Sequence, residues 1–370
     1  MNANPTADAL PLDAPKQERP SERLDRDALT QWLVDAGVMS PGASLTVEQF
    51  RGGYSNLTYA VTVDERQFVF RRPPFGNTVK TGHDMQREVR ILQALAPSFE
   101  RAPRVVASAT DQPALGGECY LMERVCGTIL RRQLPAGLDG KPEALGALSE
   151  ALIETLAALH SIPTREGPLA TLGKPEGYIE RQVTGWIDRY ARAQTDALTG
   201  METMAAFLRR RMPTSSGFPP SLIHNDFKYD NLVLDPTRPT VIRAVLDWEM
   251  ATVGDPLMDL GTTLGYWVEA GDPTPIRSLA FGPTFQPGSL TRAALVDRYA
   301  ALRGRDVPDP VFFYVFGVFK IAVIIQQIYA RFVRKKTADD RFATLGAVVA
   351  VLADFGDQTC NRDRLSASTP

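Results

Sequence analysis

The periodicity of the apolar residues changes once along the chain, and this change constrains the fold more than any other sequence feature. Between residues 45 and 125 the apolar positions fall in short β-prone runs, with one helical pattern among them. Beyond Gly127 most segments repeat apolar residues at helical spacing, except for a compact β-rich stretch at 222–248. Because β-prone runs indicate strands and helical spacing indicates helices, the sequence predicts an α+β chain. A small N-terminal lobe should precede a larger, mainly helical C-terminal lobe.

The same patterns predict the elements of each lobe. In the small lobe an antiparallel sheet is expected from strands at 45–51, 57–63, 67–72, 104–109 and 119–125, with helices at 25–37 and 82–96. In the large lobe helices are expected at 143–161, 176–212 and 311–330, with a loop at 271–290. The predicted division is a disordered leader at 1–24, lobes at 25–124 and 125–361, and a disordered tail at 362–370.

Composition is typical of a globular protein and argues against several classes of partner. The chain has 41 Lys and Arg and 43 Asp and Glu, which gives a net charge of −2. This balance gives no electrostatic reason to expect binding to nucleic acid. The three cysteines fit no metal-ligand spacing, and their odd number fits a reduced compartment, so a cytoplasmic location is predicted. Segment 311–330 is as apolar as a membrane span, but Lys320 interrupts it, so a buried core helix is expected. No pattern indicates an oligomeric state.

The residues with the clearest chemistry lie in the stretch 221–261. Asp226 and Asn231 stand in a loop between two apolar runs, and a third run ends in Asp247 at the same end of a predicted hairpin. Carboxylate and amide oxygens suit Mg²⁺, which keeps other positions for nucleotide phosphates. We therefore expect Asn231 and Asp247 to bind Mg²⁺ and Asp226 to deprotonate an acceptor hydroxyl in a phosphoryl transfer. Lys228 is expected to offer a cation to the migrating group.

This stretch resembles the catalytic and metal-binding loops of the aminoglycoside phosphotransferase and choline kinase-like superfamily. The nearest resemblance is to the kinase domains related to acyl-CoA dehydrogenase fusions, and it runs from about Leu45 to Arg334. It implies a protein-kinase-like bilobal fold and ATP- and Mg²⁺-dependent phosphorylation of a small hydroxylated molecule. An acidic cleft for a polycationic aminoglycoside is not evident in the sequence, and this branch of the superfamily points to a hydroxyacyl-CoA.

The resemblance implies the same base and metal ligands as the spacing does, and it adds supporting residues. His224 takes the position of the loop histidine, which is expected to brace the loop backbone rather than transfer a proton. Asp259 resembles the buried aspartate at a helix start that anchors the catalytic loop. Glu249 has two interpretations, an acid near the metal or a surface residue.

The nucleotide is expected to bind the small lobe through three segments. A glycine-containing loop lets the backbone approach phosphate, a cation on the third strand pairs with an acid on the next helix, and the linker offers backbone groups to adenine. The predicted nucleotide-binding residues are Gly52, Gly53, Ser55 and Asn56 in the loop, Arg71 and Glu88 in the pair, and Met122, Glu123 and Arg124 in the linker.

The cation on the third strand departs from the superfamily, because Arg71 stands where lysine is usual. An arginine keeps the charge and can bridge phosphate and carboxylate. Arg72 is the alternative, since adjacent strand residues face opposite sides.

The acceptor site is expected among the helices of the large lobe. Lys320 has two interpretations, a contact to an anionic substrate or a structural ion pair, of which the second is favoured. The basic run at 331–336 is interpreted as a solvated helix end or as a site for coenzyme A phosphates. Further candidates for its lining are Tyr178, Arg181, Trp186, Tyr266, Trp267, Gln326 and Gln327.

Other function classes are less well supported by the sequence. A nucleotide-binding pseudokinase, acting as a regulatory or interaction module, is kept open by Arg71, although the base and both metal ligands are retained. A protein kinase would need D-F-G where this chain has Asp247-Trp248-Glu249. A zinc hydrolase is poorly supplied with ligands, because the chain has only three histidines, and His83 and His160 are expected to be structural.

Overall fold

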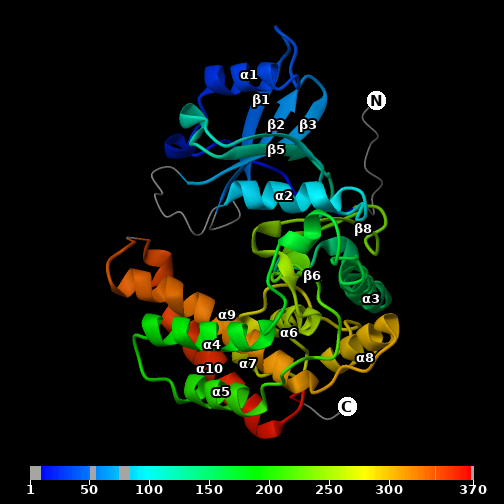
Figure 1. The fold of residues 1–370 in the computed structure, drawn as a ribbon, viewed down its shortest axis with the longest axis vertical. Helices are drawn as coiled ribbons and strands as arrows, with labels where there is room; N and C mark the ends of the chain where they lie inside the picture. The colour runs from blue at the N-terminus through cyan, green and yellow to red at the C-terminus, as the bar shows by residue number, and fades with distance from the viewer. Residues whose placement is uncertain (1–9, 51–55, 75–83, 338, 368–370) are drawn as a thin grey trace.

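The computed structural model describes residues 10–50, 56–74, 84–337 and 339–367, and these form the two expected lobes (Figure 1). In the described residues the small lobe holds a five-stranded antiparallel sheet in the order β1-β2-β3-β5-β4. Its strands are β1 (Leu45–Phe50), β2 (Leu57–Val63), β3 (Arg66–Arg72), β4 (Val105–Ala109) and β5 (Cys119–Glu123). The predicted α+β architecture is therefore confirmed.

Two helices cover opposite faces of this sheet. Helix α1 (Arg26–Asp35) packs on the face that carries Phe68 and Phe70, and Trp32 meets the Phe70 ring edge-on at 5.7 Å. Helix α2 (Met85–Leu95) packs on the face that carries Val69 and lies between the sheet and the large lobe (Figure 1). Because side chains alternate along a strand, β3 presents residue 71 on the α2 side and residue 72 on the α1 side.

The large lobe is built mainly from helices around α9 (Pro310–Val333). The other helices are α3 (Pro142–Leu159), α4 (Tyr178–Ala193), α5 (Thr199–Arg211), α6 (Pro256–Tyr266), α7 (Thr274–Ser278), α8 (Arg292–Arg303) and α10 (Leu345–Arg362). The predicted segment at 176–212 is thus two helices, α4 and α5, and the loop at 271–290 contains the short α7. Within the described residues, α9 alone is long and apolar enough for a membrane span, and 78% of its apolar window is buried inside the molecule.

Helices α6 and α9 cross at two glycines. A Cβ on Gly261 would lie 2.1 Å from the main-chain oxygen of Phe313, and one on Gly317 would lie 2.0 Å from that of Gly261. Only residues without a side chain allow the two backbones to approach so closely. This close crossing places the polar residues of α6 and Lys320 of α9 beneath the same loop.

Two small β-ladders carry the predicted catalytic segments. Strand β6 (Ser221–Ile223) pairs with β9 (Thr252–Gly254), and β7 (Leu232–Leu234) pairs with β8 (Ile242–Val245). The segment between β6 and β7, residues 224–231, is called the catalytic loop below, and the segment between β8 and β9, residues 246–251, the metal loop. The metal loop lies against α2 at the boundary between the lobes.

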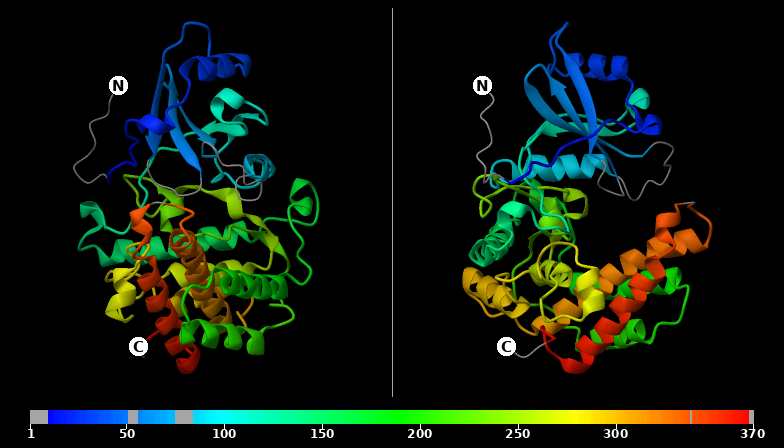
Figure 2. Two further views of the ribbon diagram at one scale, coloured as in Figure 1. Left: turned by 90° about the vertical axis from the view of Figure 1, so that its left-hand side faces the viewer. Right: turned by 180° about the vertical axis from the view of Figure 1, so that it is seen from behind.

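The prediction of a disordered leader is wrong for residues 10–24. Leu10 is buried and its N–H donates to Pro236 in the large lobe, whereas Lys16 forms a β-bridge with Gln49 of β1. Between these points the Asp13 N–H donates to Gly127, and the segment runs along the small lobe (Figure 2, right). A proline-rich segment can remain ordered when its backbone groups find partners on the folded chain.

The predicted disordered tail is also wrong for residues 362–367. The main-chain oxygen of Leu365 accepts a hydrogen bond from Arg292 at 2.7 Å, and the Ser366 hydroxyl donates to Glu269 at 3.0 Å. These contacts tie the end of the described chain to the interior of the large lobe, because Arg292 is itself buried.

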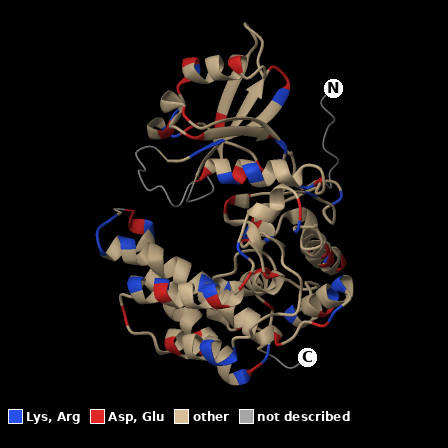
Figure 3. Cartoon of the chain, viewed as in Figure 1, with Lys and Arg blue, Asp and Glu red and all other residues tan. Residues whose placement is uncertain are grey.

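Charged residues of both signs are spread over both lobes, which agrees with the near-zero net charge (Figure 3). The basic residues after position 330 gather at the exposed end of α9. There Arg334 donates to the main-chain oxygens of Arg192 and Gln194 at 3.0 and 3.4 Å. These contacts join the end of α9 to the last turn of α4 and to the residue that follows it.

Candidate functional site

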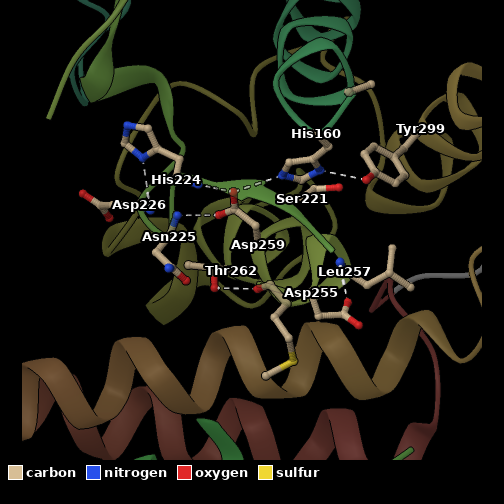
Figure 4. Close-up of polar contacts among 12 residues, drawn as sticks. His160, Ser221, His224, Asn225, Asp226, Asp255, Leu257, Asp259, Thr262 and Tyr299 are labelled. Carbon is tan, nitrogen blue, oxygen red and sulfur yellow. Dashed lines mark hydrogen bonds and ion pairs between the residues drawn. The ribbon is translucent and has the colours of Figure 1, made fainter. Parts of the chain in front are cut away.

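The catalytic loop is anchored by a buried carboxylate on α6. The Oδ2 atom of Asp259 accepts the His224 N–H at 2.6 Å, and Oδ1 accepts the Asn225 N–H at 2.7 Å (Figure 4). The His160 ring lies 3.1 Å from Oδ2 and also contacts the Tyr299 hydroxyl at 2.7 Å. Burial opposes the charge, but His160 and the backbone donors hold the pKa of Asp259 below its usual value. Asp259 therefore holds two consecutive backbone N–H groups of the catalytic loop.

His224 connects the catalytic loop to the metal loop. Its Nε2 lies 2.8 Å from the main-chain oxygen of Leu246, and its Nδ1 accepts the Asp226 N–H at 3.3 Å. The tautomer that satisfies both contacts carries its proton on Nε2. Both ring nitrogens are therefore engaged with the backbone, which agrees with a bracing role rather than proton transfer.

The predicted base, Asp226, lies at the centre of a polar cluster. The Lys228 ammonium is 2.6 Å from its Oδ2, and the Asn231 amide nitrogen is 2.9 Å from the same atom. Burial would raise the pKa of Asp226, but Lys228, with a further contribution from Tyr266, holds it below the usual value. The carboxylate is therefore ionised at neutral pH, and its side chain remains 18% exposed. It can orient a hydroxyl and accept its proton late in the reaction.

The two predicted metal ligands come from adjacent loops. The main-chain oxygen of Asn231 accepts the Leu246 N–H at 2.8 Å, which brings the catalytic loop against the residue before Asp247. Asn231 engages its amide nitrogen with Asp226, so its amide oxygen is the atom left for a cation. The Asp247 side chain is 33% exposed. This residue has a φ of 67°, a left-handed conformation that is uncommon without glycine.

This donor set fits a magnesium ion that is shared with a nucleotide. No group of three or more His, Cys, Asp and Glu side chains suited to a metal occurs in the described part of the chain. One carboxylate and one amide oxygen are too few for a metal cage made by the protein alone. They suit Mg²⁺, which takes oxygen ligands and keeps several positions for phosphates and water.

The cation expected on β3 is Arg71, and the structure places it between the lobes. Its Nη1 lies 2.5 Å from Glu88 of α2, and its Nη2 lies 3.2 Å from Asp247 of the metal loop. Arg72 faces α1 instead, and its Nε donates to the main-chain oxygen of Pro73 at 2.8 Å. Burial raises the pKa of Glu88 despite Arg71, whereas the pKa of Arg71 rises, against its own burial, because of Glu88.

Glu249 also lies next to this pair, so its interpretation as a mere surface residue is wrong. Its Oε2 accepts a hydrogen bond from the Asn56 amide at 2.7 Å and is 3.9 Å from Arg71 Nη2. Asn56 thereby reaches the metal loop from the small lobe. Gly52, Gly53 and Ser55, predicted to contact phosphate, lie outside the described residues.

The predicted linker residues differ in where they point. Met122 is buried in β5, and Glu123 is exposed, with its N–H donating to Arg104. Arg124 stacks over the Phe50 ring at 5.4 Å and donates to the main-chain oxygen of Asp13 at 3.1 Å. Its side chain is therefore engaged with the N-terminal segment.

Two residues that the sequence analysis did not single out help to assemble the site. Arg87 of α2 donates to the main-chain oxygens of Glu249 and Ala251, at 3.0 and 2.6 Å. The Trp248 N–H donates to Glu88 at 3.2 Å. Both contacts hold α2 against the metal loop. Each contact has a main-chain group at one end, so the types of residue in the sequence do not predict it.

The candidate acceptor residues are only partly brought together. Lys228 lies 4.7 Å over the Tyr266 ring, and both line a small cavity with aromatic neighbours. The lining residues are Leu152, Phe227, Lys228, Tyr229, Thr263, Tyr266, Trp267, Phe281, Gly282 and Thr284, none of them acidic. By contrast, Arg181 donates to main-chain oxygens of its own neighbourhood and Gln326 donates to that of Ala193, and neither side chain lines this cavity.

Comparison with known proteins places these features in a wider group. Residues 46–295 match the model of the phosphotransferase enzyme family. The chain is 31% identical over 325 residues to acyl-CoA dehydrogenase family member 11 of Homo sapiens, covering 86% of this chain and 40% of that protein. The chain therefore spans about two fifths of the length of that curated relative.

Solved structures share the fold. A Ralstonia eutropha protein described as a candidate aminoglycoside phosphotransferase superposes with a TM-score of 0.76 at 28% identity, covering 92% of this chain and 99% of that one. Choline kinase of Cryptosporidium parvum gives a TM-score of 0.60 at 12% identity, covering 92% and 95%. The GDP complex of aminoglycoside 2'-phosphotransferase-IIIa gives 0.56 at 17% identity, covering 92% and 98%. The kinase-like bilobal fold expected from the resemblance is confirmed.

Proposed function

The chain belongs to the phosphotransferase enzyme family, and from this membership we propose that it transfers the γ-phosphate of ATP to a hydroxyl group of a small molecule, with Mg²⁺ as cofactor. One observation carries the proposal. Arg71 and Glu88 of the small lobe meet Asp247 at the lobe boundary, while Asp226 lies in the adjoining catalytic loop. A triphosphate between these groups would have a cation on one side and the predicted base on the other.

Each protein group then has a separate task. Arg71 binds the phosphates, with Glu88 fixing its guanidinium in place. Asn231 and Asp247 would hold Mg²⁺, which when bound neutralises charge on the β- and γ-phosphates. Asp226 orients the acceptor hydroxyl: a bond forms between its oxygen and the γ-phosphorus, the bond to the ADP oxygen breaks, and the hydroxyl proton passes to the carboxylate.

The lowered pKa of Asp226 is compatible with this task. A carboxylate with a lowered pKa is a weak base and takes up little of the hydroxyl proton early in the reaction. Phosphoryl transfer through a loose transition state depends mainly on the positions of the reacting groups and on charge neutralisation. Lys228 contacts the Asp226 carboxylate and can share its charge with the transferred group. We therefore assign two successive tasks to Asp226: it first orients the acceptor hydroxyl and later accepts the hydroxyl proton.

The acceptor we propose is a neutral or anionic hydroxylated molecule, with a hydroxyacyl-CoA as the first compound to test. The cavity beside Lys228 and Tyr266 has aromatic walls and lacks carboxylates, which disfavours a polycationic aminoglycoside. The human relative is named as an acyl-CoA dehydrogenase family member, and that name suggests an acyl-CoA in the same context. A reducing, cytoplasmic setting and action without nucleic acid or membrane are proposed with it.

The decisive experiment measures ADP release from Mg·ATP with hydroxyacyl-CoAs, amino alcohols, sugars and aminoglycosides as acceptors. Asp226→Asn should lower turnover by about 10²–10⁴-fold and leave nucleotide affinity nearly unchanged. Asp188→Asn, an equivalent change at an exposed position of α4, should behave as wild type. Wild-type turnover by Asp226→Asn would remove the base from the mechanism. Nucleotide binding with no ADP release from any acceptor would instead favour a pseudokinase.

A further inference from the structure

Lys320 lies in the middle of α9 and is only 2% exposed, so an ammonium group is buried in an apolar helix. Its Nζ is 2.8 Å from the main-chain oxygen of Asn225, 3.4 Å from Asn225 Oδ1 and 3.5 Å from Thr262 Oγ1. It makes no ion pair within the described residues, and neither earlier interpretation of this lysine describes these contacts. Burying a cation among neutral groups is unfavourable, so packing alone does not account for it.

Lys320 contacts the peptide group between Asn225 and the predicted base, Asp226. The Asn225 carbonyl and the Asp226 N–H belong to this same peptide group; Lys320 binds its oxygen, and His224 Nδ1 accepts its N–H. Asn225 has a φ of 67°, and its own N–H donates to Asp259 (Figure 4). This left-handed conformation is uncommon outside glycine, and asparagine adopts it more readily than most residues.

We propose that Lys320 is a positioning residue for phosphoryl transfer, whose ammonium fixes the Asn225–Asp226 peptide so that the Asp226 carboxylate faces the acceptor hydroxyl. The effect on rate rests on the proposed function, whereas the effect on loop order does not. A charged donor suits the task, because charge-assisted hydrogen bonds are roughly twice as strong as neutral ones.

Two carboxylates and two cations lie around Lys320 and act on its pKa in opposite directions. They are Asp259 on α6, Asp226 and Lys228 on the catalytic loop, and Arg189 on α4. Burial lowers the pKa of Lys320 to about 8, and the two carboxylates oppose that decrease. The ammonium form therefore predominates at pH 7.

The first test separates positioning from general packing by steady-state kinetics. Lys320→Met keeps the length and apolar packing of the side chain, and Lys320→Gln keeps a donor that falls about one bond short of Asn225. The control is Gln326→Leu, since Gln326 is another buried polar residue of α9 and donates to the Ala193 oxygen at 2.8 Å, away from the loop. Both Lys320 variants should lose about 10–100-fold in kcat with KM for ATP within about threefold, and the control should keep its kcat. Equal losses in variants and control, or an unchanged kcat in a folded Lys320 variant, would overturn the proposal.

The second test does not depend on catalysis. Hydrogen exchange of the amides at 224–226 should become at least about tenfold faster in Lys320→Met than in wild type or Gln326→Leu. The reason is that the loop loses the hydrogen bond from Lys320 to the Asn225 oxygen. Unchanged protection would overturn the positioning role even if the enzyme is active. If wild-type protein released no ADP while this protection still fell, the proposed function would fail and the positioning of the loop by Lys320 would stand.

Discussion

Replacing Lys320 with methionine should change how the stability of the large lobe depends on pH. In the folded protein burial lowers the pKa of Lys320 to about 8, against an ordinary value of 10.5. The folded state thus holds this proton less tightly than the unfolded chain does. Below pH 8 the buried ammonium lowers the free energy of unfolding of the wild type by the full amount. This loss of stability disappears as the pH rises from 8 towards 10.5.

The magnitude follows from these two pKa values. At about 1.4 kcal/mol per pKa unit, a shift from 10.5 to about 8 corresponds to about 3 kcal/mol, most of which is recovered between pH 7 and pH 10. The methionine variant lacks this titration, although it leaves the Asn225 oxygen without its donor, a loss of about 1–3 kcal/mol that does not vary with pH. The pH dependence of the difference is therefore the informative quantity.

The assay is urea unfolding of wild type and Lys320→Met at several pH values from 7 to 10, followed by tryptophan fluorescence. The free energy of unfolding of the wild type should rise by about 2–3 kcal/mol relative to the variant over this range. Gln326→Leu, which removes a buried side chain that does not titrate, should differ from wild type by a constant amount. A difference between wild type and Lys320→Met that is equally constant would refute the reasoning.

Three further changes test other parts of the account. Arg71→Lys keeps the charge but loses one contact, because a single ammonium cannot span both acidic partners; KM for ATP should rise about fivefold, and an unchanged KM would contradict the phosphate-binding role. Asp259→Asn should lower the free energy of unfolding, measured by chemical denaturation, by about 3 kcal/mol, since the amide cannot accept hydrogen bonds from all the backbone and histidine donors. An unchanged free energy of unfolding would contradict the anchoring role of Asp259. Gly261→Ala should lower it by about 1–3 kcal/mol through the helix crossing. Gly185→Ala in α4, where an added Cβ would meet only the Arg189 side chain at 3.6 Å, should raise it by about 1 kcal/mol.

The secondary structure of the small lobe was predictable because its signals are local. The β-prone residues that predict β1, β2 and β3 lie within each strand, and the observed bounds differ from the expected ones by about one residue. The choice between Arg71 and Arg72 was not predictable, since alternation says only that the two face opposite sides. It was decided by which helix packs on which face: α1 covers the side of Phe68 and Phe70, and residue 71 is left facing α2.

The features that the sequence did not reveal are contacts to main-chain groups that are distant in the chain. Residues 10–24 have the composition of a disordered segment, yet their backbone pairs with Pro236, Gly127 and Gln49. Lys320 was expected to meet an anion, but its partner is a carbonyl 95 positions away in the chain. A carbonyl is present at every residue, so residue type carries no information about which one will be used.

The catalytic loop was an intermediate case. The spacing of Asp226, Asn231 and Asp247 indicated that their segments would meet, and the Leu246 N–H to Asn231 hydrogen bond brings the two loops together. The network that orients them, from Asp259 through His224, depends on a helix that follows later in the chain. Its geometry therefore required the assembled large lobe.

The most direct test of the metal site is a crystal of the protein grown with Mn²⁺ and a non-hydrolysable ATP analogue, with the metal located by its anomalous scattering. The account predicts one manganese position or two at the lobe boundary, coordinated by the Asn231 amide oxygen and the Asp247 carboxylate together with phosphate oxygens, and Asp226 free of the metal and facing the γ-phosphate. Manganese bound away from Asn231 and Asp247, or triphosphate bound outside the space between Arg71 and the catalytic loop, would contradict it.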